Sequence, residues 1–447
     1  MNISLNSVSV FRSVLCIGVT ALLSVSGAAQ SPRAYAEATA GAEGSTVNDA
    51  LILDMRQALD AATSTTSEQG DETSVAYTQL IENIERQQGA YDPALTQQLL
   101  ALGASLQTQA RHEEAVAVFK RGVHLARINT GLYSAEQIAL LRGEINSYFA
   151  LGDFAQVDER RRYLYRVERR ALRDDSGAST QALLDQALWQ RQAYVMGIDD
   201  AETRFARLQS MWQLNRMALD EVIKTEGETA PALLAPLYGM LQSQYLVAGY
   251  QGFDEVLAGV SYDNRHLAHN SVAYKQGRSV LEAIMLINAT NSGDDMALRA
   301  RDLVQLGDWA WWFGDRSAAI EHYQQAYNAI AQSADPEGLT TALFGAPTPI
   351  PNIDGIQPLP AYNADENGPL TINFAISETG RVTDLATLKV PEDEPEDAAI
   401  SSDRLLRHLR KIRFRPSLEA GEAISRTDIV WSFNPQNWQP NTVAMTQ

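Results

Sequence analysis

The stretch "LLALGASLQTQARHEEAVAVFKRG" (99–122) sets the pattern for most of this chain of 447 residues. Counted from its Gly103, offsets of 12, 16 and 19 residues carry a small, an aromatic and a small residue: Ala115, Phe119 and Gly122. A second stretch, "LVQLGDWAWWFGDRSAAIEHYQQA" (303–326), carries a Leu-Gly pair at Leu306, as the first does at Leu102. From its Gly307, the same offsets carry Ala319, Tyr323 and Ala326. Two copies so far apart indicate an internal repeat.

This spacing resembles the tetratricopeptide repeat, a pair of antiparallel helices. The resemblance implies that the small residues lie where two helices approach closely, and that the aromatic residue fills the neighbouring gap. A third stretch (140–164) keeps Tyr148 and Gly152 but has Val157 where the pattern has Ala. With apolar residues recurring at helical spacing and little proline, we expect an α-helical repeat domain over 75–333. Its repeat units between 165 and 295 stay unassigned.

The composition of the sequence changes after residue 333. Seven of the sixteen prolines fall in 334–369. Proline at this density ends helices and stiffens an extended chain, so we expect a linker over 334–367 and two domains that fold separately.

Beyond the linker the apolar period changes from 3.6 to 2. In "LTINFAI" (370–376) and in "IVWSF" (429–433), alternate residues are apolar, which predicts strands with one buried face. "SETGRV" (377–382) supplies a turn into a second strand that ends near Val390, and a helix over 401–411 precedes the last strand. We expect a small α+β domain over 368–433 and a disordered tail over 434–447.

The order of these elements resembles the C-terminal domain of TonB-type energy transducers. The matching features are Gly-Arg-Val after the first turn, the helix running into "RFRP" (413–416), and a glycine before the last strand. The chain departs from the family in an acidic insertion, "PEDEPEDAAI" (391–400), and in a reduced Tyr-Pro segment before the first strand. Receptor contacts therefore do not follow from the resemblance.

The stretch "DRLLRHLRKIRFRPSLEAG" (403–421) packs six Lys and Arg residues into a chain of net charge −19. Leucines occupy one side of the expected helix, and Arg404, Arg407, His408 and Lys411 occupy the other. The favoured interpretation is a solvated helix face, and a partner-binding role stays open. The last strand is expected near a sheet edge, where it can take up a peptide strand. The partner-binding candidates are therefore Ile429, Val430, Trp431, Arg404, Arg407 and Lys411.

The N-terminus has the features of a signal peptide. Arg12 precedes the apolar stretch 13–27, and small residues suited to cleavage follow at 27–29 and 34–36. We expect a signal peptide over 1–29 and a flexible, low-complexity segment over 30–74 with one helix candidate at 47–62. Cys16 is the single cysteine, so the mature chain would carry no disulfide and no catalytic thiol.

Composition and motifs exclude several classes of function. Acidic residues outnumber Lys and Arg by 55 to 36, which argues against nucleic acid as a partner. No nucleophile elbow, phosphate-binding glycine loop or His-Glu-x-x-His motif occurs. His266 and His269 form a His-x-x-His pair without evident further ligands, so we expect no metal site, no cofactor and no catalytic residue there. The tryptophans of "DWAWWFG" (308–314) are expected to pack in the core.

These features together predict a multidomain periplasmic adaptor or scaffold. It would carry a tetratricopeptide-like solenoid and a TonB-like domain, bind a protein or peptide of the bacterial cell envelope, and lack enzymatic activity. The first alternative is an energy transducer in transport, which requires an uncleaved inner-membrane anchor. The second is an exported enzyme without a local motif. The sequence does not identify the partner, the oligomeric state or the process served.

The N-terminus separates adaptor from transducer. We predict cleavage after Ala29, or failing that after Ala36, because the apolar stretch is short and Ser- and Thr-containing, and small residues follow it. Intact-mass analysis of the protein from its native envelope measures this. A mass that retains residues 1–29, found in the inner-membrane fraction, would contradict the adaptor and support the transducer.

Overall fold

The structure is a computed structural model that describes residues 67–250, 262–356, 358–364, 368–390, 402–419 and 422–433. These residues fall into two compact units, 67–190 and 191–433, with the division inside helix α9. The predicted signal peptide, the helix candidate 47–62 and the predicted tail lie outside the described residues. The division also lies inside the predicted repeat domain 75–333, so each unit is described by itself.

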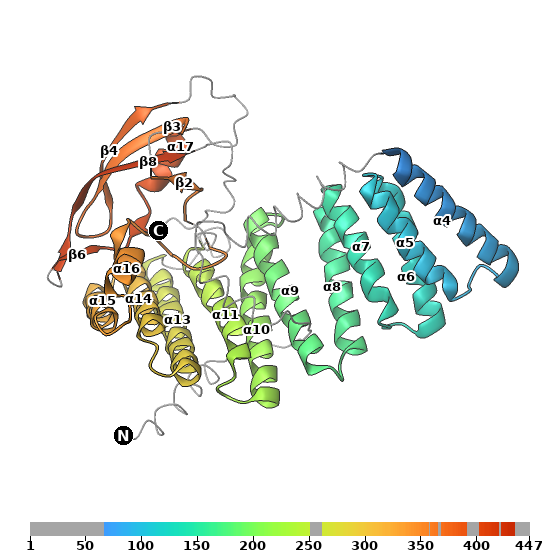
Figure 1. The fold of residues 1–447 in the computed structure, drawn as a ribbon, viewed down its shortest axis with the longest axis horizontal. Helices are drawn as coiled ribbons and strands as arrows, with labels where there is room; N and C mark the ends of the chain where they lie inside the picture. The colour runs from blue at the N-terminus through green and yellow to red at the C-terminus, as the bar shows by residue number, and fades with distance from the viewer. Residues whose placement is uncertain are drawn as a thin grey trace. The chain divides into compact units, whose positions relative to one another are not determined.

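Unit 67–190 consists of antiparallel helices joined by short connections (Figure 1). The helices are α4 (Ser67–Gln88), α5 (Ala94–Thr108), α6 (His112–Thr130), α7 (Glu136–Ala150), α8 (Phe154–Ala171) and the first part of α9 (Ser176–Met196). From α4 to α8 each helix packs against the next. Helix α4 begins eight residues before the expected domain start, because Ser67–Ser74 is helical rather than part of the flexible segment.

The repeat spacing is explained by contacts between glycine and aromatic side chains. A Cβ on Gly103 would collide with the ring of Phe119, and a Cβ on Gly307 would collide with the ring of Tyr323. Phe119 and Tyr323 are both fully buried. The expected close approach of small residues with a neighbouring aromatic is therefore confirmed in both copies.

The turns inside the repeats also follow from the sequence. Gly152 and Gly314 have φ of 73° and 87°, a region that favours glycine. The aspartate after each one caps the next helix, since Asp153 accepts from the Gln156 N–H at 3.1 Å and Asp315 from the Ala318 N–H at 3.2 Å. A Gly-Asp pair thus ends one helix and starts the next.

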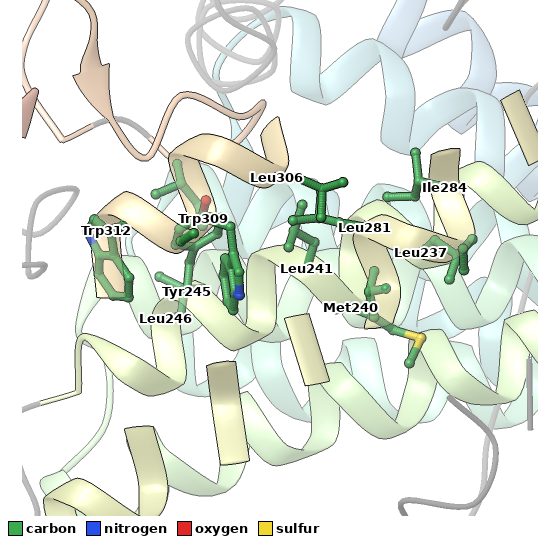
Figure 2. Close-up of a cluster of buried hydrophobic side chains, with 14 of the residues drawn as sticks. Leu237, Met240, Leu241, Tyr245, Leu246, Leu281, Ile284, Leu306, Trp309 and Trp312 are labelled. Carbon is green, nitrogen blue, oxygen red and sulfur yellow. The ribbon is translucent and has the colours of Figure 1, made fainter. Parts of the chain in front are cut away.

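Unit 191–433 continues the helices and adds the sheet. Its helices are α10 (Ala201–Glu226), the short 3₁₀ helix η1 (Pro231–Leu233), α11 (Leu234–Ala248), α13 (Tyr262–Ser292), α14 (Met296–Phe313) and α15 (Arg316–Ile330). Figure 2 shows their core, in which Trp309 and Trp312 pack edge-on against Tyr245, with ring centroids 4.5 and 5.2 Å apart. Trp309, Trp311 and Trp312 are all buried, which confirms the core assignment of these tryptophans.

The C-terminal sheet has four strands in the order β2-β8-β3-β4. They are β2 (Tyr362–Asn363), β3 (Leu370–Ile376), β4 (Val382–Lys389) and β8 (Arg426–Phe433), and α17 (Ser402–Leu409) covers one face. The predicted inward residues of β3 and β8 share one buried cluster with Leu405 and Leu409. A short hairpin of β6 (Ser417–Glu419) and β7 (Glu422–Ile424) was not anticipated from the sequence.

The segment expected to be an extended linker, 334–367, differs from that expectation. It forms α16 (Pro336–Thr340), the π-helical turn η2 (Thr341–Gly345) and β1 (Pro349–Ile350), and β1 pairs with β5 (Arg413–Phe414). Ile350 and Ile356 are buried in the helical core. Isoleucines between the prolines supply the apolar surface that lets this segment pack instead of spanning free space.

A buried ion pair joins the sheet region to helix α14. Arg415 donates through Nε and Nη2 to the two carboxylate oxygens of Asp308, at 2.8 and 2.6 Å, and through Nη1 to the Leu343 carbonyl. Both side chains are about 5% exposed. Burial alone would lower the pKa of Arg415, but the Asp308 carboxylate raises that pKa above its ordinary value. The expectation of two domains that fold separately therefore does not fit this shared interface.

Replacing Arg415 tests how much the unit depends on that pair. Arg415→Met leaves the Asp308 carboxylate buried without its cation, so we expect the free energy of unfolding to fall by about 3–5 kcal/mol. Urea unfolding followed by tryptophan fluorescence measures the loss. Arg404→Met removes an exposed cation from α17 and should stay within about 0.5 kcal/mol of wild type. A loss below about 1 kcal/mol for Arg415→Met would contradict the prediction.

Candidate functional site

The partner-binding residues predicted on the last strand face inward. Ile429 and Trp431 are 6% and 2% exposed and pack under α17. Tyr362 of β2 stacks on the Trp431 ring, with centroids 3.7 Å apart. Strand β8 pairs along its length with β3 and at Ser432 and Phe433 with β2, so it is not the outer strand of the sheet. Val430 is half-buried, and β2 does not reach Ile429, Val430 or Trp431, so peptide binding along this part of β8 stays a prediction.

The predicted basic residues of α17 do form a solvated face. Arg404, Arg407 and Lys411 are exposed, whereas Leu405 and Leu409 on the opposite side pack against Ile429 and Trp431. The structure therefore does not bring the two predicted groups together on one surface.

His408 does not belong to the basic face on which the sequence placed it. Its side chain is buried, with Nε2 2.7 Å from the Pro358 carbonyl, and burial lowers its pKa. Arg413 and Arg415, from the same basic run, leave this region and reach helix α14. Arg413 donates to the Trp311 carbonyl at 3.0 Å, and Arg415 holds Asp308. The basic run is thus part solvated face and part internal anchor.

The outer strands of the described sheet are β4 and the two-residue β2, so β4 is the longer exposed edge. Asp384, with φ of 50°, lies where an extra residue interrupts the pairing with β3, and a second irregularity follows near Leu388. Such bulges change which residues face the core. Leu388 and Val390 are consequently 54% and 55% exposed. Sequence alternation alone does not reveal a bulge, so this edge was missed.

In unit 191–433 a segment that follows η2 in the chain packs on the helices. Residues 349–356, called the docked segment below, place Ile350 and Ile356 in the helical core. The Gln242 side-chain amide donates to the Asp354 carbonyl at 2.6 Å, and a Cβ on Gly355 would collide with the Arg191 guanidinium. No residue of α11, all of which is described, is exposed. The docked segment therefore packs on α11 through a tight turn at Asp354 and Gly355, closed by the Ile356 N–H donating to the Ile353 carbonyl at 3.2 Å.

In unit 67–190 the corresponding helices keep an exposed stripe. On α7 the exposed residues are three or four apart, which places them on one face: Glu136, Ala139, Arg142, Asn146 and Ala150. On α5 a similar face carries Ala94, Gln97, Ala104 and Thr108. Gln107 fastens the two helices by donating to the Gly143 carbonyl and to Ser147 Oγ, both at 2.8 Å. We call these two faces the open stripe.

A charged cluster lies beside the open stripe, between α7, α8 and α9. Arg142, Arg161, Glu168 and Asp185 line a cavity of about 20 Å³. Arg142 donates to Glu168 at 2.9 Å. Burial raises the pKa of Glu168 to about 7 and also raises that of Asp185. A cavity of this size holds about one water, so the cluster is no substrate pocket.

A comparison of the repeats with one another could have revealed this charged cluster from the sequence. Arg161 stands four residues after Val157, which is the repeat position that Phe119 takes after Ala115 and Tyr323 takes after Ala319. Its guanidinium lies 5.6 Å from the centroid of the Trp189 ring. A cation in an aromatic position requires acidic partners, which Glu168 and Asp185 provide.

Other predicted features give no catalytic or metal centre. His266 and His269 fall within α13, but their side chains lie outside the described part of the molecule. In the described part, no three His, Cys, Asp or Glu side chains gather closely enough to hold a metal ion. Among the described helices, none has an apolar stretch long enough to cross a bilayer.

Comparison with known proteins yields structural likeness only. No family model and no curated protein matches the sequence. Among solved structures, the chain is similar to BtubC (BKLC) from P. vanneervenii, with 10% identity and a TM-score of 0.31 over 60% of this chain and 92% of that one. It is also similar to a Podosopora anserina kinesin light chain with nearly identical TPR-like repeats, with 16% identity and a TM-score of 0.34 over 54% and 97%. The tetratricopeptide-like assignment rests on the helix packing described above.

Glu168 predicts a measurable pH dependence. Because its pKa is raised in the folded protein from 4.5 to about 7, the folded state binds more protons than the unfolded state between those values. Stability from this group is therefore lost as pH rises through that window, by about 3 kcal/mol. Glu168→Gln should remove this fall in urea unfolding between acid and mildly basic pH. Glu159→Gln, on the exposed face of the same helix, should keep it, and equal curves for wild type and Glu168→Gln would contradict the assignment.

Proposed function

We propose that this protein is an interaction scaffold whose N-terminal repeats bind a protein partner along the open stripe. The observation that carries the proposal is the contrast between the two units. Helix α11 has no exposed residue and carries the docked segment, whereas α5 and α7 expose their stripe to solvent. Helical repeats present such faces as binding surfaces for extended segments.

The docked segment indicates the chemistry that such a face accepts. Its isoleucines enter the helical core, and a glutamine side chain binds its backbone carbonyl. The open stripe offers similar groups, with Gln97 and Asn146 as amides and Arg142 as a cation. We therefore propose that the partner is a peptide segment whose backbone is held by side-chain amides and which carries an acidic group for Arg142.

The second part of the proposal concerns the location of the protein and the role of its C-terminal domain. The signal-peptide pattern supports export to the periplasm, and the order of strands and helix supports a TonB-like C-terminal domain. In this proposal the partner belongs to the cell envelope, and the domain takes up a peptide strand at β4, because β4 is the longer of the two outer described strands and exposes Leu388 and Val390. The alternative, an energy transducer, needs the N-terminal segment to stay uncleaved.

Site-specific photocrosslinking distinguishes the two proposed surfaces. A photoreactive residue at Asn146 on the open stripe should capture a discrete partner in native envelopes. The same residue at Leu388 tests strand addition at β4, and Glu159, exposed on α8, is the control. Capture at Leu388 alone would move binding to the sheet, and the same product at Glu159 would show non-specific contact. Absence of a product at both Asn146 and Leu388 would contradict the scaffold proposal.

A further inference from the structure

One end of unit 67–190 collects three connections between helices. Because α4 to α9 run alternately up and down, the connections 89–93, 131–135 and 172–175 lie at the same end, the lower end of this unit in Figure 1. Exposed apolar side chains gather in or beside two of them. Tyr91 is 62% exposed, Ile128 52% and Leu132 48%.

The same region is basic within an acidic chain. Residues 120–173 contain eleven Lys and Arg but six Asp and Glu, a net charge of +5, whereas the whole chain has −19. Three of those six acidic side chains are buried: Glu144, Asp158 and Glu168. These three carboxylates form ion pairs with Arg160, Arg162 and Arg142, so the surplus of positive charge lies on the other basic residues of the segment.

Three arginines of this surface have no carboxylate partner among the described residues. Arg127 and Arg166 lie over the Tyr163 ring, at 5.9 and 5.7 Å from its centroid, and Arg170 lies over the Tyr133 ring at 4.0 Å. All three are exposed. The rings orient the guanidinium groups while leaving their N–H donors available to an external anion.

Hydrogen bonds hold the connections in place. Gln137 donates to the Gly131 carbonyl at 3.0 Å, and the Tyr163 hydroxyl lies 2.8 Å from Gln137 Oε1 and 3.2 Å from the Leu132 carbonyl. Asn129 donates to the Tyr91 carbonyl at 3.0 Å, which ties one connection to the next. The exposed apolar groups are thus presented on a fixed backbone.

Four acidic residues lie in or directly beside these connections: Asp92, Glu136, Asp174 and Asp175. Hydrogen bonds from Thr130 and Ser134 lower the pKa of Glu136, so its carboxylate stays ionised. Asp92 accepts from the Ala94 N–H at 2.9 Å, and Asp175 accepts from the Ala178 N–H at 2.9 Å. Asp174 is exposed and lies 3.6 Å from Arg173. None of these four described residues forms an ion pair with Arg127, Arg166 or Arg170, which can therefore meet an external anion.

We propose that this end, defined by Arg127, Arg166, Arg170, Tyr133, Ile128 and Leu132, binds the surface of an anionic lipid membrane. Guanidinium groups pair with lipid phosphates, tyrosine favours the headgroup layer, and the exposed aliphatic side chains enter the adjacent acyl boundary. Aliphatic groups beside the arginines favour a lipid surface over an acidic protein, whose charge needs no such groups.

Vesicle co-sedimentation of the full chain tests the proposal. Phosphatidylcholine vesicles with about a third phosphatidylglycerol should bind the protein, and neutral vesicles should bind it at least about tenfold more weakly. Salt should weaken the binding. The triple variant Arg127→Gln, Arg166→Gln, Arg170→Gln should lose this preference. Arg404→Gln, Arg407→Gln, Lys411→Gln loses the same charge from α17 and should keep it.

A second variant, Ile128→Ser with Leu132→Ser, keeps every charge and should also weaken vesicle binding. Circular dichroism verifies that each variant is folded. Equal binding to neutral and anionic vesicles, or an equal loss in the α17 variant, would overturn the proposal. Binding to polyglutamate as tight as to vesicles, unchanged by the serine substitutions, would assign the surface to an acidic protein instead.

Discussion

The ion pair between Arg415 and Asp308 is the interaction on which unit 191–433 depends. Two charges removed from water are tolerated only when each satisfies the other, and here both carboxylate oxygens accept from one guanidinium. Tyr323 adds a third hydrogen bond to Asp308 at 2.9 Å, and burial together with that carboxylate raises the pKa of Tyr323 far above its ordinary value. Tyr323 is also the aromatic that covers Gly307, so the repeat packing and the anchor of the sheet meet at one residue.

Local patterns predicted the elements well. The spacing of Gly103 and Phe119 indicated a helix pair because it reports a contact between neighbouring helices, and the alternation of β3 reports one buried face. Long-range partners were not predictable in the same way. Nothing in "RFRP" indicates that Arg415 reaches a carboxylate 107 residues earlier, and nothing in the β4 sequence indicates that Asp384 breaks the alternation. The open stripe is likewise visible only once the docked segment shows which faces are covered.

Both units pack their helices in the same way, but they differ in what covers the helix faces. In unit 191–433, the docked segment and the sheet region belong to the same chain as the helices and pack on them. In unit 67–190, arginine side chains replace part of the aromatic core around Arg161, and the solvent-facing stripe on α5 and α7 stays uncovered. A scaffold of this kind separates the surface that stabilises the protein from the surface that can engage a partner.

The docked segment and its binding face on α11 belong to one continuous chain, and this raises the occupancy of that face. A tethered ligand acts at a local concentration that is roughly millimolar for a short connection. A free peptide with equal contacts, present at about micromolar concentration, would occupy the face of α11 roughly a thousandfold less often. Helix α11 is therefore closed to ordinary competitors, and Gln242 and Arg191 behave as a receptor that is permanently saturated by its own sequence.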